Sequence, residues 1–176
     1  QPTASLVELG HYFYGITIIG GVNGAGVYYK IKPDGTGFEI LYHFASSGTT
    51  RVPNTQLIYG NDGYFYGTTR HGGSDDVGTI YKIKVDGSHF VQLFEFSQAN
   101  GVTPEGKLLK HNGVLYGTTT RGGDMGHGVV FRINRDGTGY TKLHQFGNND
   151  GSHPFGGLVT DKKGNLWGMT RIGGYH

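Results

Sequence analysis

The chain of 176 residues has no cysteine, which excludes disulfide bonds, thiolate metal sites and cysteine nucleophiles. Charged side chains make up only 16% of the sequence and the formal net charge is +2, so no strongly basic surface is available for nucleic acid or an anionic membrane. The apolar run 16–19 stops at Gly20 and is far shorter than the 18 or so residues of a membrane span. We therefore expect neither a nucleic-acid partner nor membrane insertion.

What the sequence does contain is glycine and aromatic residues. Glycine accounts for 34 positions, well above the average usage of about 7%. The 12 tyrosines and 10 phenylalanines supply the large apolar side chains that disordered or collagen-like chains lack. This composition predicts a folded, turn-rich, all-β protein with almost no helix.

A motif of one aromatic residue and glycine recurs at a period of about 51 residues. It stands at 14–15, 66–67, 116–117 and 167–168, with spacings of 52, 50 and 51. Other markers recur in the same register: Gly-Gly at 20–21, 72–73, 122–123 and 173–174, Asp-Gly at 34–35, 86–87 and 136–137, and proline at 53, 104 and 154. The chain is therefore a tandem repeat.

Each unit has the pattern of four short strands, named a to d. In the second unit, strand a is expected at 57–59 and strand b at 64–69, and strand c follows the Gly-Gly corner. Strand c alternates with a period of two, which is the pattern of a strand with one more apolar face. Strand d instead spaces its apolar residues by three, as in Phe38, Leu41 and Phe44, so we expect a bulge or burial on both faces there.

The turn residues predict how the strands connect. Pairs such as Asp62-Gly63 between a and b, and Asp86-Gly87 between c and d, are typical of tight hairpins because glycine adopts positive φ without strain. Four strands joined in this way form an antiparallel meander whose connections alternate between its two ends. The tight a–b and c–d turns should therefore share one end, and the longer b–c and d–a loops the other. Binding residues commonly lie on such loops.

A single unit of this size buries too little apolar surface to fold alone, so the units must stack face to face. A four-stranded meander repeated in tandem is typical of a β-propeller blade. We predict one repeat domain over residues 1–176 with about three and a half blades, and units near 6–56, 57–107, 108–157 and, in part, 158–176.

Known propellers close with about 4 to 8 blades. Two copies joined head to tail would leave one c–d pair missing, so a seven-bladed dimer fails in register. We therefore expect a segment of a longer propeller, with the remaining blades from the same protein or another copy. The first residue, Gln1, is not methionine, which suggests a mature form after signal removal or a piece of something longer.

The order of motifs in each unit resembles a known repeat. Tyr-Gly-Thr-Thr, Gly-Gly, a basic alternating strand, Asp-Gly-Thr-Gly and Leu-x-x-Phe resemble the GloVer tandem repeat, the Gloeobacter and Verrucomicrobia type repeat of exported bacterial proteins. The resemblance covers essentially the whole chain. It implies a propeller-like, secreted or cell-surface protein and implies no activity. The first unit departs from the pattern with Ile16, Thr17, Ile18 and Ile19, which argues against a ligand role shared by all copies.

Several stretches resemble motifs of other protein classes but lack the residues or spacing that those motifs require. The stretch 101–107 is close to a phosphate-binding loop, but Leu108 replaces the hydroxyl residue that holds magnesium and no helix follows. The nine histidines, His71, His127 and His153 among them, do not pair at metal-ligand spacing. Acidic or amide residues of the loops do not match a calcium-binding pattern; they are Asp75, Asp76, Asp124, Asn148, Asn149 and Asp150. We expect no metal site and no cofactor.

Arginine recurs near the Gly-Gly corner. Arg70, Arg121 and Arg171 precede or adjoin three of the corners, and His71 lies beside the first. Planar guanidinium groups gathered on the loop face could grip a carboxylate, such as that of an acidic sugar. They could also pack over a neighbouring aromatic ring or bind loop carbonyls. We name Arg70, His71, Arg121 and Arg171 as candidate ligand-binding residues and no residue as catalytic.

Three functional interpretations stay open. The favoured one is a non-enzymatic recognition or adhesion module of an exported protein that binds glycan or protein through the b–c and d–a loops. The second is a polysaccharide lyase or hydrolase that uses histidine and arginine of that face; a hydrolase would need two acids about 5 to 10 Å apart. The third is a structural component of a surface assembly.

Overall fold

The computed structural model describes residues 5–46, 51–147 and 149–174. All regular structure in these ranges is β-strand, so they contain no helix that could cross a membrane. The strands in chain order are β1 (Val7–Leu9), β2 (Tyr12–Ile16), β3 (Val27–Ile31), β4 (Glu39–His43), β5 (Arg51–Pro53), β6 (Ile58–Tyr59), β7 (Tyr64–His71), β8 (Thr79–Lys84), β9 (Val91–Glu95), β10 (Leu109–His111), β11 (Val114–Thr119), β12 (Val129–Asn134), β13 (Thr141–Gln145), β14 (Ser152–Pro154), β15 (Val159–Thr160), β16 (Leu166–Trp167) and β17 (Thr170–Ile172).

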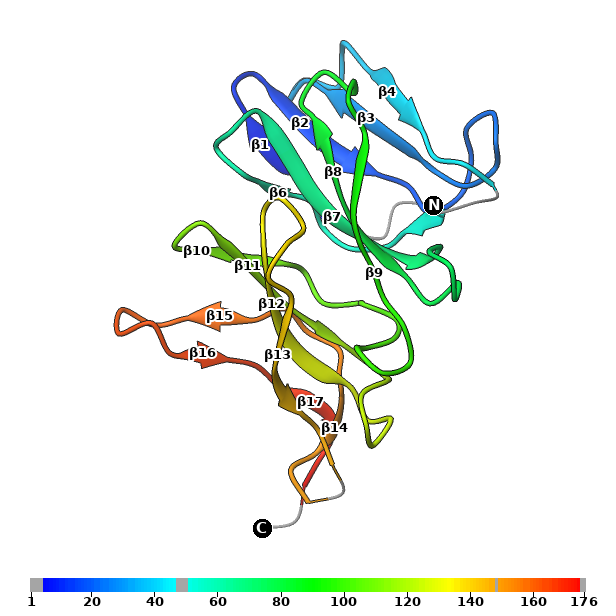
Figure 1. The fold of residues 1–176 in the computed structure, drawn as a ribbon. Coiled ribbons are helices and arrows are strands. Elements are labelled where there is room, and N and C mark those ends of the chain that lie inside the picture. Colours follow the sequence, from blue (N-terminus) through cyan, green and yellow to red (C-terminus); the bar gives the residue numbers. More distant parts are fainter. Residues whose placement is uncertain (1–4, 47–50, 148, 175–176) are drawn as a thin grey trace.

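The strands form successive antiparallel meanders, which confirms the predicted order a-b-c-d. Blade 1 contains β1 to β4, blade 2 contains β5 to β9, and blade 3 contains β10 to β13. A half blade follows, in which β15 pairs with β16 and β14 pairs with β17. In Figure 1 the sheets succeed one another from blue to red. This is the architecture of β-propeller blades.

The d–a segments differ from the expected loops because they contribute short strands. Arg51 and Pro53 of β5 pair with His71 and Thr69 at the end of β7, and β14 pairs with β17 in the same way. Blade 3 has a single bridge between Val102 and Arg121 at this place. In blades 2 and 3 and in the half blade, strand b continues beyond its pairing with strand a, and the d–a segment satisfies backbone groups that strand a does not reach.

The unusual spacing in strand d has the predicted cause. Tyr28 pairs with Tyr42 and Tyr29 with Ile40, so Leu41 is an extra residue between them. The same register shift leaves Leu93 and Leu143 as the extra residues of β9 and β13. The bulge is therefore confirmed at the central leucine of the motif in all three blades.

The two ends of the sheets also carry the connections that the turn residues predicted. Nη1 of Arg135, at the c–d turn of blade 3, donates to the carbonyl of Gly60, in the a–b turn of blade 2, over 3.1 Å. At the other end, the backbone N–H of Thr103 donates to Val77 O, which joins a d–a segment to a b–c loop. We call these the turn end and the loop end.

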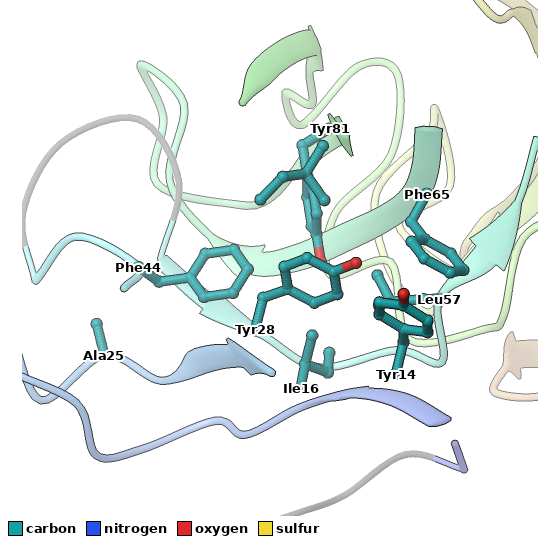
Figure 2. Close-up of a cluster of buried hydrophobic side chains, with 9 residues drawn as sticks. Tyr14, Ile16, Ala25, Tyr28, Phe44, Leu57, Phe65 and Tyr81 are labelled. Atoms are coloured by element: carbon teal, nitrogen blue, oxygen red, sulfur yellow. The ribbon is translucent and has the colours of Figure 1, made fainter. Parts of the chain in front are cut away.

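The hydrophobic cores lie between blades. Figure 2 shows Tyr14, Tyr28 and Phe44 of blade 1 meeting Phe65 and Tyr81 of blade 2. A second cluster joins blades 2 and 3, with Tyr66, Ile80 and Phe96 on one side and Leu115, Phe131 and Ile133 on the other. Burial of each such side chain is worth about 1.5 to 3 kcal/mol. This arrangement confirms that the units are stabilised by stacking.

Glycine is required where strands and blades approach closely. A methyl group on Gly117 of strand b would lie 2.5 Å from the ring of Phe131 in the neighbouring strand c. A methyl group on Gly137 of the c–d turn would overlap the carbonyl oxygen of Leu93 in the preceding blade. The repeated glycines therefore serve packing as well as turn conformation.

Candidate functional site

Three of the four candidate residues line a single pocket of about 330 Å³ at the loop end. Arg70 belongs to β7 of blade 2, Arg121 follows β11 of blade 3, and Arg171 belongs to β17 of the half blade. We call this the arginine pocket. Its lining residues are Arg70, Thr103, Glu105, Thr120, Arg121, His153, Phe155 and Arg171.

The three arginines do not occupy one repeat position. Arg70 and Arg171 are equivalent in their units, and Thr120 stands at that position in blade 3. Arg121 is one residue further along the chain. The first unit has Ile18 at the position of Arg70, so the residues of blade 1 add no charge there. The pocket is thus asymmetric, with its positive groups drawn from blades 2 and 3 and the half blade.

The wall of the pocket includes backbone in an unfavourable conformation. Val52, Thr103 and His153 stand at equivalent positions, each directly before a proline, and have positive φ values of 55°, 58° and 58°. Residues other than glycine rarely adopt such angles, and such strain is often held at functional sites. Sequence reasoning missed Thr103 and considered His153 only as a possible metal ligand, although the recurring proline beside them was a signal.

Hydrogen bonds fix this strained segment between two blades. Thr120 donates from its backbone N–H and from Oγ1 to the carbonyl of Thr103, over 3.1 and 3.2 Å. The N–H of His153 donates to His127 O over 2.9 Å. The pocket wall is therefore anchored by the b–c loop of blade 3 and by the end of its strand b.

Positive charge dominates the pocket. Nε of Arg70 lies 3.8 Å from Oε1 of Glu105, whose side chain is 16% exposed against 54% for that of Arg70. Glu105 is thus held in the wall, while the arginine side chain reaches into solvent. Within the described ranges, the guanidinium groups of Arg121 and Arg171 make no hydrogen bond or ion pair. Three guanidinium groups therefore face a single carboxylate, which leaves donors available for an anionic ligand.

His71 lies apart from the arginine pocket. Its Nδ1 is 3.7 Å from Oδ2 of Asp76, and Nη2 of Arg51 donates to the same carboxylate oxygen. Arg51, followed by the N–H of Gly72, holds the pKa of Asp76 below its ordinary value. The structure thus groups Arg70, Arg121 and Arg171 and places His71 in a separate ion-pair cluster that ties β5 to the b–c loop.

The histidines and loop acids form no evident metal centre. The ring centroids of His127 and His153 are 6.3 Å apart. No group of three or more potential ligands is arranged for a metal among the residues that the structure describes. Asp124 accepts hydrogen bonds from Lys142 and Gln145, and Asp150 pairs with His144. Asn148 lies outside the described residues.

Comparison with models of protein families identifies the family to which the repeat belongs. The model of the Gloeobacter/Verrucomicrobia repeat matches residues 1–176. The chain belongs to this family. A comparison with curated protein sequences gave no match.

Solved structures similar to this Gloeobacter/Verrucomicrobia repeat chain are propellers of diverse function. The structure of a nidogen/laminin complex contains a chain with a TM-score of 0.61 and 18% identity, covering 86% of this chain and 49% of that one. A gluconolactonase from Xanthomonas campestris has a TM-score of 0.57 and 19% identity, and the match covers 90% of this chain and 52% of that one. A GH43 protein from Bacillus licheniformis has a TM-score of 0.50 and 17% identity, and the match covers 93% of this chain and 35% of that one. The chain spans about half or less of these structures, and the likeness establishes the fold alone.

The threonines of the Gloeobacter/Verrucomicrobia repeat motif shape the base of the loop end. Oγ1 of Thr17, Thr69 and Thr119 donates to the carbonyl two residues later, over 2.9, 2.7 and 2.9 Å. In blades 1 and 3 the same oxygen accepts the first N–H of strand c, that of Val27 and that of Val129. The second threonine therefore fixes the corner that carries the site residues and does not itself line the pocket.

Proposed function

We propose that this chain is a non-enzymatic recognition module of an exported bacterial protein and that its arginine pocket binds a carboxylate-bearing glycan. The observation that carries the proposal is the convergence of Arg70, Arg121 and Arg171 from three successive sheets on one pocket with one carboxylate. Guanidinium groups bind carboxylates in a planar, bidentate manner, which gives orientation as well as affinity.

The surroundings of the pocket suit a sugar chain better than a small inorganic anion. A second pocket of about 580 Å³ shares Phe155 and Arg171 with the arginine pocket and adds Met169. Phe155 is 54% exposed. Ligand sites commonly combine apolar and aromatic surface with a few polar groups that fix orientation. A uronate unit would place its carboxylate among the arginines and its ring against this apolar surface.

The composition of the pocket favours binding over hydrolysis. Glu105 is the one carboxylate among its lining residues, whereas glycoside hydrolysis ordinarily uses two acids about 5 to 10 Å apart. A lyase would need a base beside the positive groups, and His153 is the residue of that kind in the pocket. Lyase chemistry is therefore the alternative that the experiment must separate from binding. Export is proposed from the type of bacterial protein in which the repeat occurs.

The test measures binding of oligogalacturonate to the chain by calorimetry, with the methyl-esterified oligosaccharide as the neutral counterpart. We expect the acid form to bind and the ester to bind far more weakly. Arg121→Ala and Arg171→Ala should each weaken binding roughly ten- to hundredfold, the range expected for loss of one hydrogen-bonded charged group. Affinity should also fall with added salt.

Arg132→Ala is the matched control, because Arg132 is an exposed arginine of β12 outside the arginine pocket. It should leave affinity unchanged. Equal binding of acid and ester, or binding unaffected by the pocket substitutions, would contradict the proposal. Unsaturated products, detected by their ultraviolet absorbance, would show that the chain is a lyase and would contradict the proposal of a non-enzymatic recognition module.

A further inference from the structure

Glu105 is the one acidic residue among the described residues that line the arginine pocket. A carboxylate in this place opposes the binding of an anion, because like charges in one site repel each other. Its oxygens accept no hydrogen bond from any residue that the structure describes, and Nε of Arg70, 3.8 Å from Oε1, is too distant for one. The half-buried carboxylate therefore has acceptor capacity that a ligand can satisfy.

The repeat fold does not require an acid at this position. In each unit a residue with positive φ precedes a proline, and the residue after that proline is Asn54, Glu105 or Phe155. The proline recurs, whereas the residue after it is an amide, a carboxylate or an aromatic ring. The ion pair with Arg70 also contributes little to stability, because the arginine side chain is more than half exposed. The carboxylate is therefore a feature of the pocket and not of the blade.

The backbone on both sides of Glu105 is fixed between blades 2 and 3. The carbonyl of Pro104 accepts a hydrogen bond from Oγ1 of Thr68, in β7, over 3.2 Å. On the other side, a methyl group on Gly106 would lie 2.5 Å from Oγ1 of Thr118, in β11, so the chain packs tightly there. The backbone that carries the carboxylate is thus preorganised, which lowers the entropic cost of binding a ligand.

We infer that Glu105 is a specificity-determining residue of the arginine pocket and accepts a hydrogen bond from a ring hydroxyl of the bound uronate, an inference that rests on the proposed function. The carboxylate of the ligand binds the guanidinium groups of Arg121 and Arg171, and the hydroxyl donates to Glu105. The charge of Glu105 also disfavours a second anionic group in place of that hydroxyl. The pocket therefore selects a uronate with free hydroxyls over one that is acetylated or sulfated on the ring.

The experiment compares three galacturonate oligosaccharides of equal length by calorimetry. One has free ring hydroxyls, one is O-acetylated on the ring and one is O-sulfated on the ring. All three keep their carboxylates, so the comparison isolates the hydroxyl. The wild type should bind the free form at least about tenfold more tightly than the O-acetylated form, as expected for loss of a hydrogen bond to a charged group. The O-sulfated form should also bind more weakly than the free form.

Two substitutions separate the charge of Glu105 from its size. Glu105→Gln keeps the size and removes the charge, so it should raise the affinity for the O-sulfated form roughly tenfold. Glu105→Ala removes the acceptor and should bring the ratio of the free-form to the O-acetylated-form affinity close to one. Glu39→Ala is the matched control, because Glu39 pairs with Lys30 outside the pocket. It should leave both preferences at their wild-type values.

The results distinguish failure of this inference from failure of the proposed function. Equal binding of the free and O-acetylated forms by the wild type would overturn the inference, as would preferences that both substitutions of Glu105 leave unchanged. If binding in those cases still depends on Arg121 and Arg171, the proposed function stands. No binding of any of the three forms by the wild type would overturn both. The equivalent positions hold asparagine and phenylalanine, so the substitutions of Glu105 should not prevent folding.

Discussion

Alanine substitution of the c–d turn glycines separates the two roles that glycine has in this fold. Gly35 and Gly137 are equivalent, with φ values of 83° and 91°. A methyl group on Gly35 meets no atom within 4 Å, whereas one on Gly137 overlaps the carbonyl oxygen of Leu93 in the preceding blade. Gly35→Ala therefore tests the turn alone, and Gly137→Ala tests the turn together with blade stacking.

The two variants should differ clearly in stability. Alanine in the left-handed region costs roughly 1–2 kcal/mol, and the smaller entropy of its unfolded chain offsets about 0.4–1 kcal/mol of this. Gly35→Ala should thus lower the free energy of unfolding by about 0.5–1 kcal/mol. Gly137→Ala adds an overpacking cost of about 1–3 kcal/mol, because the carbonyl of Leu93 can move only with its strand.

Thermal unfolding followed by circular dichroism measures the difference. For a chain of this size, about 1 kcal/mol corresponds to a shift in Tm of roughly 2–4 °C, so Gly137→Ala should melt about 2–12 °C below Gly35→Ala. Gly87→Ala should resemble Gly137→Ala, since its methyl group would overlap the carbonyl oxygen of Leu41. Equal Tm values for Gly35→Ala and Gly137→Ala would refute the argument that the turn glycines are required by the neighbouring blade.

Two further substitutions test the loop end. Thr119→Val removes the hydroxyl that donates to Arg121 O and accepts from Val129 N, so it should cost about 1–3 kcal/mol in urea unfolding. Thr141→Val, at an exposed site, should change little, and equal effects of the two would contradict the proposed role of the motif threonine. Asp76→Asn removes a carboxylate whose pKa is lowered by Arg51, so its stabilisation is present above the ordinary aspartate pKa of about 4 and is lost as pH falls below it. The Tm of the wild type should exceed that of this variant near neutral pH, and the two Tm values should converge in acid. A difference in Tm that does not change with pH would refute the ion-pair explanation.

The blade pattern was predictable because it depends on local rules. Asp34 and Asp86 each accept hydrogen bonds from the residue two positions later at the c–d turn, a local motif visible as Asp-Gly-Thr or Asp-Gly-Ser. The bulge at Leu41 likewise followed from a spacing of three in a segment that had to be a strand. Such features involve neighbours in the chain, so their residues identify them.

The candidate site was only partly predictable. Arg70 and His71 are adjacent in sequence, yet Arg70 lines the arginine pocket while His71 pairs with Asp76. Glu105 and His153 line the pocket because the d–a segment at the end of each unit lies against strand b of the same unit, where Oγ1 of Thr68 donates to Pro104 O and Oγ1 of Thr118 donates to Gly156 O. No local motif reveals such contacts, since they join residues tens of positions apart.

By itself the sequence determined the repeat period, the strand order, the turns and the gathering of loops at one end, because alternation, glycine and Asp-Gly pairs act over a few residues. Only the tertiary structure decided which surfaces of equivalent residues are covered. Tyr66 is 1% exposed and Trp167, at the same repeat position, is 60% exposed. The difference arises because burial depends on the neighbouring blade, which no residue of the unit itself encodes.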